Sequence, residues 1–411
     1  MKLIGPFTQA LPLADLPMKG AIADEDLKII EQAGVLLEDG KILAVDTFDK
    51  LQKENPEVAV TEIQESMVLL PSFVDCHTHI CWGGNRARDY AMRIAGKPYL
   101  EIARAGGGIW DSVTKTRAAS EGELTNITIQ RANRHLADGI TTIEVKSGYA
   151  LDVENELKML KAIKNADREV KADLVSTCLA AHIKPKDFEG DAAAYLQYIL
   201  ENLLPEIKQQ GLSNRVDIFI EDTAFNEEVS VSYLLAAKAM GFEITIHADQ
   251  FSTGGSAVGK EVGAVSVEHL ESSTEEEIRL IADSDMVAVA LPGASLGLGM
   301  QYTPSRKLLD AGACLAIATD WNPGSAPMGD LLMQAAVLSA SEKLSSAEVF
   351  AGITYRAAAA LNLNDRGRLA EGMLGDMVAF PCETYQEILY QQGRLKPTYV
   401  WKKGEEVEGK R

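Results

Sequence analysis

Short apolar runs alternate with longer amphipathic stretches through the middle of the chain. Eight runs rich in Val, Ile and Ala resemble buried strands, and stretches between them, such as residues 151–166, repeat apolar positions at helical spacing. Strands this apolar are covered on both faces, so the alternation predicts a parallel sheet wrapped by helices. Eight strand–helix units over about 250 residues match a (β/α)8 barrel. The predicted strands are residues 68–79, 141–147, 172–182, 216–222, 242–248, 264–270, 286–293 and 313–320.

A doubly wound open sheet is the alternative for the same alternation. Its dinucleotide-binding form carries G-x-G-x-x-G after the first strand, and this chain has no such motif there. The Gly-rich tract at 105–110, "AGGGIW", is not followed by G-K-[ST], so we interpret it as a loop or hinge over the barrel mouth. The predicted fold class is therefore α/β, with a (β/α)8 TIM barrel.

Both ends of the chain have a different, β-rich pattern. Residues 34–45 read as a hairpin with Asp39 and Gly40 at its turn. Residues 372–380 and 397–407 contain further strand patterns, the second with a turn at Lys403 and Gly404. We expect the two ends to pair into one small β-sandwich beside the barrel. The predicted domains are residues 1–67 and 368–411, which build the β-sandwich, and residues 68–367, which build the barrel.

The histidines are concentrated where the predicted strands end. Of the six, only His135 lies elsewhere, in a helix-like stretch, and we assign it to a helix surface. His77 and His79, two residues apart in an extended segment, can face one point. An isolated pair of this kind is usually two satisfied core histidines, but barrel enzymes place their chemistry at strand ends, which favours a metal site. The candidates at strand ends are His77, His79, His182, His247, His269 and Asp320.

Composition and charge exclude several other classes. The formal net charge of -20 and the lack of Lys or Arg runs argue against a nucleic acid or an anionic surface as partner. No apolar run approaches the roughly 18 residues of a membrane span, and Pro6 and Pro12 interrupt any signal-like N-terminal stretch. The five cysteines are odd in number, scattered and without a C-x-x-C pair, which indicates reduced thiols. We expect a soluble cytoplasmic protein with a small-molecule substrate.

Six segments carry a resemblance to a known family. The segments "HTHICWGGNRARDYAMRIAGKPYLEIARAGGGI", "EVKSGYAL", "AAHIKPKDF", "HADQFSTGG", "VEHLE" and "TDWNPGSAPM" resemble the imidazolonepropionases of the amidohydrolase superfamily. The H-x-H pair with a late Asp is common to the superfamily, whereas "GGNR", "KSGY" and "DWNPGS" are more specific. The resemblance implies a homodimeric enzyme of histidine degradation, with one zinc or iron ion, that hydrolyses 4-imidazolone-5-propanoate to N-formimidoyl-L-glutamate.

The resemblance also implies a role for individual residues. Three imidazoles and a carboxylate would hold the metal, a set that leaves a position for water and suits zinc or iron(II). His269 would orient and deprotonate the water or stabilise the developing oxyanion, and Asp320 would relay the proton to the leaving ring nitrogen. Lys146 is interpreted as the partner of a nearby carboxylate, with a metal-bridging carboxylated lysine as the alternative. The implied ligands are His77, His79, His247 and Asp320, and the implied substrate-binding residues are Arg86, Tyr149, His182, Gln250, Asn322, Gly324 and Ser325.

Two departures from the family pattern affect this interpretation. Gln250 stands where many members have Glu, and because an amide does not titrate, a base role falls to His269 or Asp320. The loop at 291–304 is smaller and more Gly-rich than the aromatic segment common in the family. Another cyclic-amide hydrolase or a deaminase is the alternative within the class, and Arg86 argues against a nucleobase, which has no carboxylate. A non-catalytic assembly protein is disfavoured because all four ligands are retained.

Overall fold

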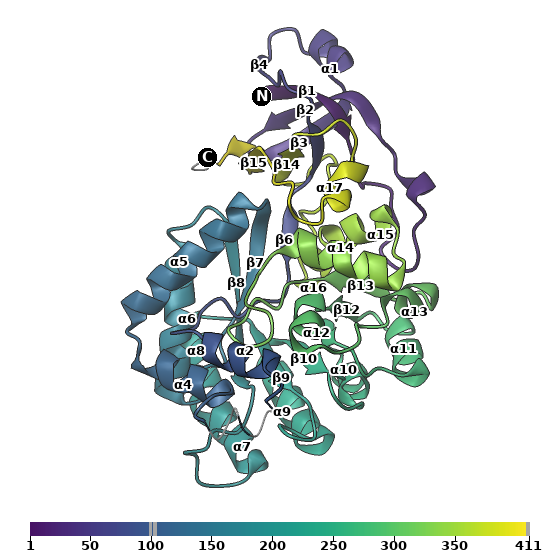
Figure 1. The fold of residues 1–411 in the computed structure, drawn as a ribbon. Helices are drawn as coiled ribbons and strands as arrows, with labels where there is room; N and C mark the ends of the chain where they lie inside the picture. Colours follow the sequence, from purple (N-terminus) through teal and green to yellow (C-terminus); the bar gives the residue numbers. More distant parts are fainter. Residues whose placement is uncertain (98–100, 102–104, 408–411) are drawn as a thin grey trace.

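The computed structural model describes residues 1–97, 101 and 105–407, so part of the "GGNR" motif's segment, residues 98–100 and 102–104, lies outside the described residues. Two sheets organise the chain: a barrel, and a smaller sheet built from both chain ends (Figure 1). In spatial order the smaller sheet contains β16 Glu405–Glu406, β15 Tyr399–Lys402, β14 Met377–Phe380, β5 Val68–Pro71, β1 Lys2–Ala10, β2 Ile30–Glu38 and β3 Lys41–Thr47, and β4 Ala59–Glu62 pairs with β1.

Both predicted hairpins are present in the smaller sheet. β2 and β3 pair antiparallel across Asp39 and Gly40, whose φ angles of 49° and 77° suit a tight hairpin turn. β15 and β16 likewise pair antiparallel. A core of its own lies against this sheet, where the rings of Phe7 and Trp401 meet edge to face at 5.9 Å. The prediction of a small β-domain made from both chain ends is confirmed.

Eight parallel strands form the barrel in the same order as in the chain. They are β6 Phe73–Asp75, β7 Ile140–Lys146, β8 Asp173–Ala181, β9 Arg215–Phe219, β10 Glu243–Ala248, β11 Ser266–His269, β12 Val287–Ala290 and β13 Cys314–Ile317. Beyond the ends of β6 and β13, a parallel bridge joins Thr78 to Trp321, so the barrel closes at its carboxyl end. The predicted (β/α)8 barrel is confirmed.

The first apolar run, residues 68–79, is shared between the two sheets. Its prediction as a single barrel strand is wrong, because β5 pairs with β14 and β1 in the smaller sheet and only β6 belongs to the barrel. The chain crosses at Ser72, whose N–H donates to the Asp376 carbonyl at 3.0 Å and whose Oγ lies 2.6 Å from Thr141 Oγ1. Both strands are fully buried, and the one local sign of the crossing is Pro71 at the end of β5, because proline is unusual inside a central strand.

Helices surround the barrel and several begin at polar caps. Ser120 and Glu123 form a capping box at the start of the long helix before β7, as the sequence S-x-x-E suggests. The barrel-domain helices are α2 Ala87–Ile94, α4 Ile109–Ala118, α5 Glu121–Ala137, α6 Val153–Asp167, α7 Ala192–Asn202, α8 Leu204–Gln210, α9 Glu227–Ala239, α10 Gly255–Val262, α11 Glu275–Ala282, α12 Pro292–Leu298, α13 Ser305–Asp310, α14 Leu331–Glu342, α15 Ser346–Gly352 and α16 Tyr355–Ala360. The remaining ones are η1 Asp24–Asp26, α1 Phe48–Glu54 and α17 Gln386–Tyr390.

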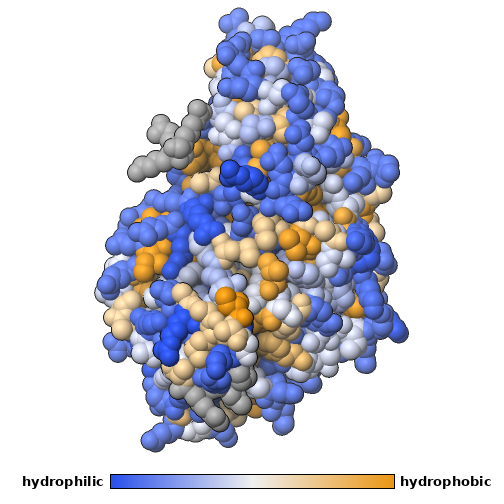
Figure 2. Space-filling model, in the orientation of Figure 1, coloured by the Kyte–Doolittle hydropathy of each residue, from blue (hydrophilic) through white to orange (hydrophobic). Residues whose placement is uncertain are grey.

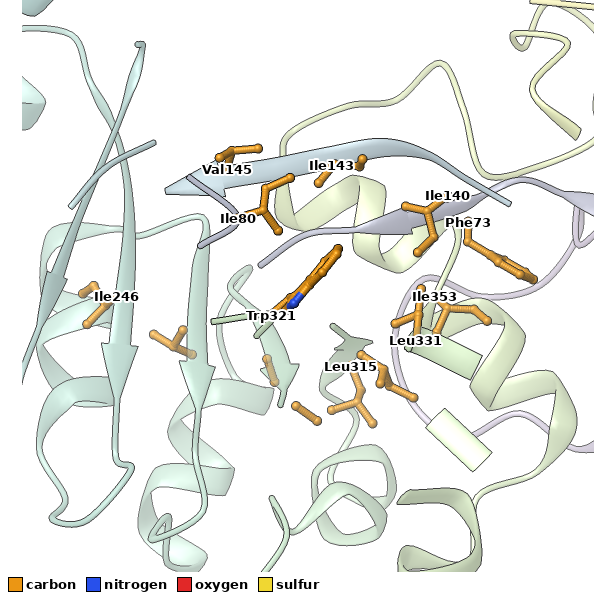
Figure 3. Close-up of a cluster of buried hydrophobic side chains, with 14 of the residues drawn as sticks. Phe73, Ile80, Ile140, Ile143, Val145, Ile246, Leu315, Trp321, Leu331 and Ile353 are labelled. Atoms are coloured by element: carbon orange, nitrogen blue, oxygen red, sulfur yellow. The ribbon is translucent and has the colours of Figure 1, made fainter. Parts of the chain in front are cut away.

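His135 lies inside the protein, and its assignment to a helix surface is wrong. It is fully buried on the barrel side of α5, with Nε2 3.0 Å from Asp75 Oδ2. Its ring also lies 4.7 Å from that of Trp321, which Figure 3 shows among buried apolar side chains of the core. Ala132 and Leu136 are buried on the same helix, so the helical spacing places His135 on the inner face.

On the face shown in Figure 2, hydrophobic residues form separate groups among hydrophilic ones. No helix within the described part of the chain has the length and apolar character needed to cross a membrane.

Candidate metal centre and active site

Side chains from the ends of different barrel strands meet at one point. His77 Nε2 lies 3.4 Å and His79 Nε2 3.3 Å from Asp320 Oδ1, and the two Nε2 atoms are 3.3 Å apart. The ring of His247, from β10, lies 4.6 Å from that of His77. One ring nitrogen from each of His77, His247 and His269 falls within 4.8 Å of the others. The structure therefore brings the four predicted ligands together, with His269 beside them.

Backbone geometry holds this cluster in place. The Asp320 N–H donates to the His77 carbonyl at 3.0 Å, and the His79 N–H donates to the Trp321 carbonyl at 3.0 Å. Asp320 and His269 have φ angles of 48° and 83°, which are uncommon outside glycine. Such conformations persist where the surroundings enforce them, and they concentrate at functional sites.

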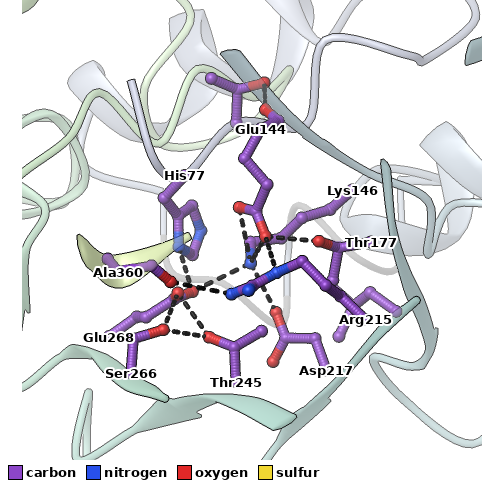
Figure 4. Close-up of polar contacts among 12 residues, drawn as sticks. His77, Glu144, Lys146, Thr177, Arg215, Asp217, Thr245, Ser266, Glu268 and Ala360 are labelled. Atoms are coloured by element: carbon purple, nitrogen blue, oxygen red, sulfur yellow. Dashed lines mark hydrogen bonds and ion pairs between the residues drawn. The ribbon is translucent and has the colours of Figure 1, made fainter. Parts of the chain in front are cut away.

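Buried carboxylates contact Nδ1 of two histidines of the cluster and orient their rings; Figure 4 shows the contacts around His77. His77 Nδ1 lies 2.5 Å from Glu268 Oε2, and His247 Nδ1 lies 2.9 Å from Asp217 Oδ2. With Nδ1 directed at a carboxylate, each ring turns its Nε2 toward the centre, the arrangement that orients metal-binding histidines. The Lys146 ammonium contacts Glu144 at 2.9 Å, Asp217 at 2.8 Å and Glu268 at 3.0 Å. The prediction that Lys146 pairs with a carboxylate is confirmed.

Burial and the surrounding charges shift the pKa values of the cluster in different directions. Burial opposes the charge on His77, yet Glu268 and Asp320 outweigh it and raise the pKa of His77 to about 10. Burial likewise opposes the charge on Asp320, but His77 and His79 hold its pKa well below the usual value. Burial lowers the pKa of His247, which keeps this imidazole neutral and able to act as a ligand. Three buried imidazoles and a carboxylate within this spacing fit a divalent transition-metal ion such as zinc or iron.

A cavity of about 300 Å³ opens over the cluster. It also receives cationic, acidic and apolar side chains that sequence reasoning missed, among them Asp89, Arg93 and Lys97. For Asp89 and Arg93 the signal was the helical spacing from Arg86, because residues three and seven positions along a helix share a face. The predicted substrate-binding residues Arg86, Tyr149, His182, Gln250, Asn322, Gly324 and Ser325 all line this cavity.

The "DWNPGS" loop is shaped by its own side chains. Asn322 Oδ1 accepts hydrogen bonds from the N–H groups of Gly324 at 2.7 Å and Ser325 at 2.9 Å, which is an Asx turn. A Cβ atom on Gly324 would lie 2.4 Å from Arg86 Nη1, so only glycine leaves room for the guanidinium. Asn322 thus has the turn-forming role expected of such a residue and also lines the cavity.

Two histidines flank the four-residue cluster. His182 Nδ1 donates to the Gly148 carbonyl at 3.1 Å, which leaves its Nε2 free, and its ring stacks on His79 with centroids 5.7 Å apart. His269 Nδ1 lies 3.5 Å from Glu271 Oε2. His269 also lines the cavity, beside the ring of His247.

The Gly-rich loop at 291–304 contains α12, which packs closely against the cavity wall. A Cβ atom on Gly297 would lie only 1.7 Å from the Ser325 carbonyl oxygen, so this contact requires glycine. Leu298 at the end of α12 lines the cavity. The small residues of α12 therefore let it pack directly against the "DWNPGS" loop. Larger aromatic side chains would not fit between the two segments at this separation.

Comparisons with known proteins agree with this geometry. The amidohydrolase family matches residues 68–407. The chain is 38% identical over 392 residues to an imidazolonepropionase from Bdellovibrio bacteriovorus, covering 94% of this chain and 92% of that protein. It is 40% identical over 341 residues to an imidazolonepropionase from Alteromonas mediterranea, covering 82% and 81%. The crystal structure of an adenosine deaminase from Xanthomonas campestris with bound zinc has a TM-score of 0.69 at 18% identity, covering 98% and 92%, and this likeness concerns the fold alone.

Proposed function

Because the chain belongs to the amidohydrolase family and, within it, to the imidazolonepropionases, we propose that its cavity hydrolyses the cyclic amide of 4-imidazolone-5-propanoate to N-formimidoyl-L-glutamate. One observation carries the proposal: a cluster of three histidines and Asp320 lies at the floor of a cavity that Arg86 also lines. The cluster suits hydrolysis of an unreactive amide, and the guanidinium suits a substrate with a carboxylate.

We propose that His77, His79, His247 and Asp320 hold one zinc or iron ion. Such an ion, when bound, lowers the pKa of water to about 7 and polarises a carbonyl group. A positioned base alone contributes roughly 10²- to 10⁴-fold, so most of the activation of water is assigned to the ion. Glu268 and Asp217, which face Nδ1 of His77 and His247, keep both rings in the tautomer that offers Nε2 as a ligand.

The surrounding side chains supply the proton transfers. His269 Nε2 takes a proton from the attacking water, because its Nδ1 faces Glu271. The water oxygen bonds to the ring carbonyl carbon, and the bond from that carbon to the ring nitrogen breaks. Asp320 Oδ2, which lies 3.5 Å from Ser325 Oγ while Oδ1 faces the histidines, takes the remaining proton of the added water and passes it to the leaving nitrogen, and His269 releases its proton to solvent. The products carry a new carboxylate and an open formimidoyl group.

Substrate recognition follows from the lining of the cavity. Arg86 binds the propanoate, and such a charge-assisted contact contributes about 1.5 to 3 kcal/mol. Gln250 both donates to and accepts from the imidazolone ring without titrating. Tyr149 and His182 lie against the remaining edge of the ring. A deaminase acting on a nucleobase is the second candidate in the class, and the arginine-lined cavity disfavours it because a nucleobase has no carboxylate.

We further propose a cytoplasmic homodimer, in keeping with the family and with five cysteines that are all buried and free. The test of the activity uses the purified protein, loaded separately with zinc and with iron(II) and incubated with enzymatically generated 4-imidazolone-5-propanoate. We expect N-formimidoyl-L-glutamate to form, and metal analysis of the protein as isolated to identify the native ion. Absence of this product from protein with stoichiometric metal would refute the proposed function.

A further inference from the structure

Helix α2 presents two arginines to the same cavity. Arg86 is the N-cap residue of α2 and Arg93 lies in its last turn, seven positions further along. Seven residues are nearly two helical turns, so both side chains leave the helix on one side. Both line the cavity, together with Lys97 just beyond the helix.

The three cations differ in their partners. Arg86 Nε contacts Asp89 Oδ2 at 2.8 Å, and the same oxygen accepts from the Gly108 N–H at 2.8 Å. Lys97 Nζ contacts Glu101 Oε1 at 2.8 Å. Within residues 1–97, 101 and 105–407, no carboxylate lies within ion-pair distance of Arg93, which is therefore the uncompensated charge of this group.

Arg93 has hydrogen-bonding capacity to spare. Its Nη2 donates to the Gly324 carbonyl at 3.2 Å, a neutral acceptor, and its Nε is buried without a hydrogen-bond partner. Burial and the nearby Arg86 charge lower the pKa of Arg93, and the Asp89 charge, which lies beyond ion-pair distance, opposes them only in part. An anion between the two guanidiniums would relieve both effects.

Gly324 lies between the two arginines. Arg93 donates to its carbonyl oxygen, and Arg86 Nη1 occupies the space that a Cβ atom would need. Both guanidiniums therefore lie against Gly324 in the "DWNPGS" loop. Arg93 contacts its backbone carbonyl, and Arg86 fills the space that its lack of a side chain leaves open. A carboxylate has two oxygens and can accept from two such forks at once.

Resting on the proposed function, we propose that Arg93 is a specificity-determining residue that binds the substrate propanoate together with Arg86. Arg86 supplies the directed hydrogen bonds, since its own charge is shared with Asp89. Arg93 supplies the unpaired positive charge that matches the single negative charge of the propanoate. The pair therefore selects ligands with an anionic side chain over neutral ones of the same shape.

The test compares two stable probes, imidazole-4-propanoate and imidazole-4-propanamide, whose binding to the metal-loaded enzyme is measured by calorimetry and by inhibition. For Arg93→Gln we expect the dissociation constant of the propanoate to rise about 10- to 100-fold, with little change for the propanamide. Arg93→Lys, which keeps the charge, should lie between wild type and Arg93→Gln. Arg88→Gln is the matched control, because Arg88 lies exposed on the same helix and its loss changes net charge equally.

The outcomes separate the roles of Arg93. Equal weakening of both probes would mean that Arg93 only braces the Gly324 loop, and unchanged propanoate binding would mean that it has no part in recognition. Either result overturns the inference while leaving the proposed function standing. If the wild-type protein binds neither probe and does not hydrolyse imidazolone propanoate, the proposed function itself is refuted.

Discussion

Glu268→Gln tests how the network beneath the cluster positions its histidines. The change removes one negative charge and keeps the shape of the side chain. Thr245 Oγ1 and Ser266 Oγ donate to Glu268 Oε1 at 2.6 and 2.9 Å, and an amide oxygen can still accept both bonds. Lys146 keeps its contacts with two other carboxylates, so we expect the variant to fold.

The magnitude follows from the contact between Glu268 Oε2 and His77 Nδ1. With the amide oxygen accepting from Thr245 and Ser266, the amide NH2 faces His77 Nδ1 and cannot accept its proton, so this bond to a charged acceptor, which contributes about 1.5 to 3 kcal/mol, is lost. The lost negative charge beside a cation site adds to that loss. We therefore expect the zinc dissociation constant to rise about 10- to 100-fold, the usual range for such partners of metal ligands.

The assay is a titration of metal-free protein with zinc in competition with a chromophoric chelator, with the unfolding midpoint of the metal-free protein as a check on folding. Glu271→Gln is the matched control, because Glu271 makes the corresponding contact with His269, 3.5 Å from its Nδ1. It should lower kcat and leave zinc affinity nearly unchanged. Equal loss of affinity in both variants, or none in Glu268→Gln, would refute the division into a ligand histidine and a base histidine.

Three further changes probe the remaining roles. Asp320→Ala should abolish turnover and bound metal in a protein that still gives the circular dichroism spectrum of the wild type; a near-normal rate with stoichiometric metal would rule out Asp320 as a ligand. Arg86→Lys should mainly raise KM, since the ammonium keeps the charge but loses the bidentate fork, and an unchanged KM would place the propanoate elsewhere. His269→Ala should lower kcat/KM by about 100-fold or more between about pH 5 and 9, and Gln250→Ala by much less. The opposite order would give Gln250 the role assigned here to His269.

The barrel and its chemical end could be predicted from sequence because each left a local signal. Parallel strands buried on both faces read as short apolar runs, and histidines at the ends of such runs have few structural uses. The crossing at Ser72 left only one local signal, Pro71 just before it, because proline cannot donate to a neighbouring strand and is unusual inside a central strand; the residues on both sides are buried. What assigns β5 and β6 to different sheets is the pairing of β5 with β14, which comes from the other end of the chain.

Other features depended on contacts that no single segment contains. His135 resembled a surface residue because its partner, Asp75, comes from the first barrel strand. Arg93 was not predicted, because what distinguishes it is that Arg86 and Lys97 are each paired with a carboxylate. The pairings of Arg86 with Asp89 and of Lys97 with Glu101 follow helical spacing, whereas the lack of a nearby carboxylate for Arg93 among the described residues depends on the loops that pack against the helix.

The seam of the barrel and the floor of the cavity are built from the same backbone. The bridge from Thr78 to Trp321 joins the first barrel strand to the last, and Thr319 Oγ1 donates at 2.5 Å to Asp75, a residue 244 positions away along the chain. His77, His79 and Asp320 adjoin these contacts directly. It follows that the ligand cluster is incomplete in any partly folded chain whose seam is open, however well its other strands have paired. Assembly of the site is thus tied to the closing step of folding, and an incompletely folded chain has no premature centre to capture metal or substrate.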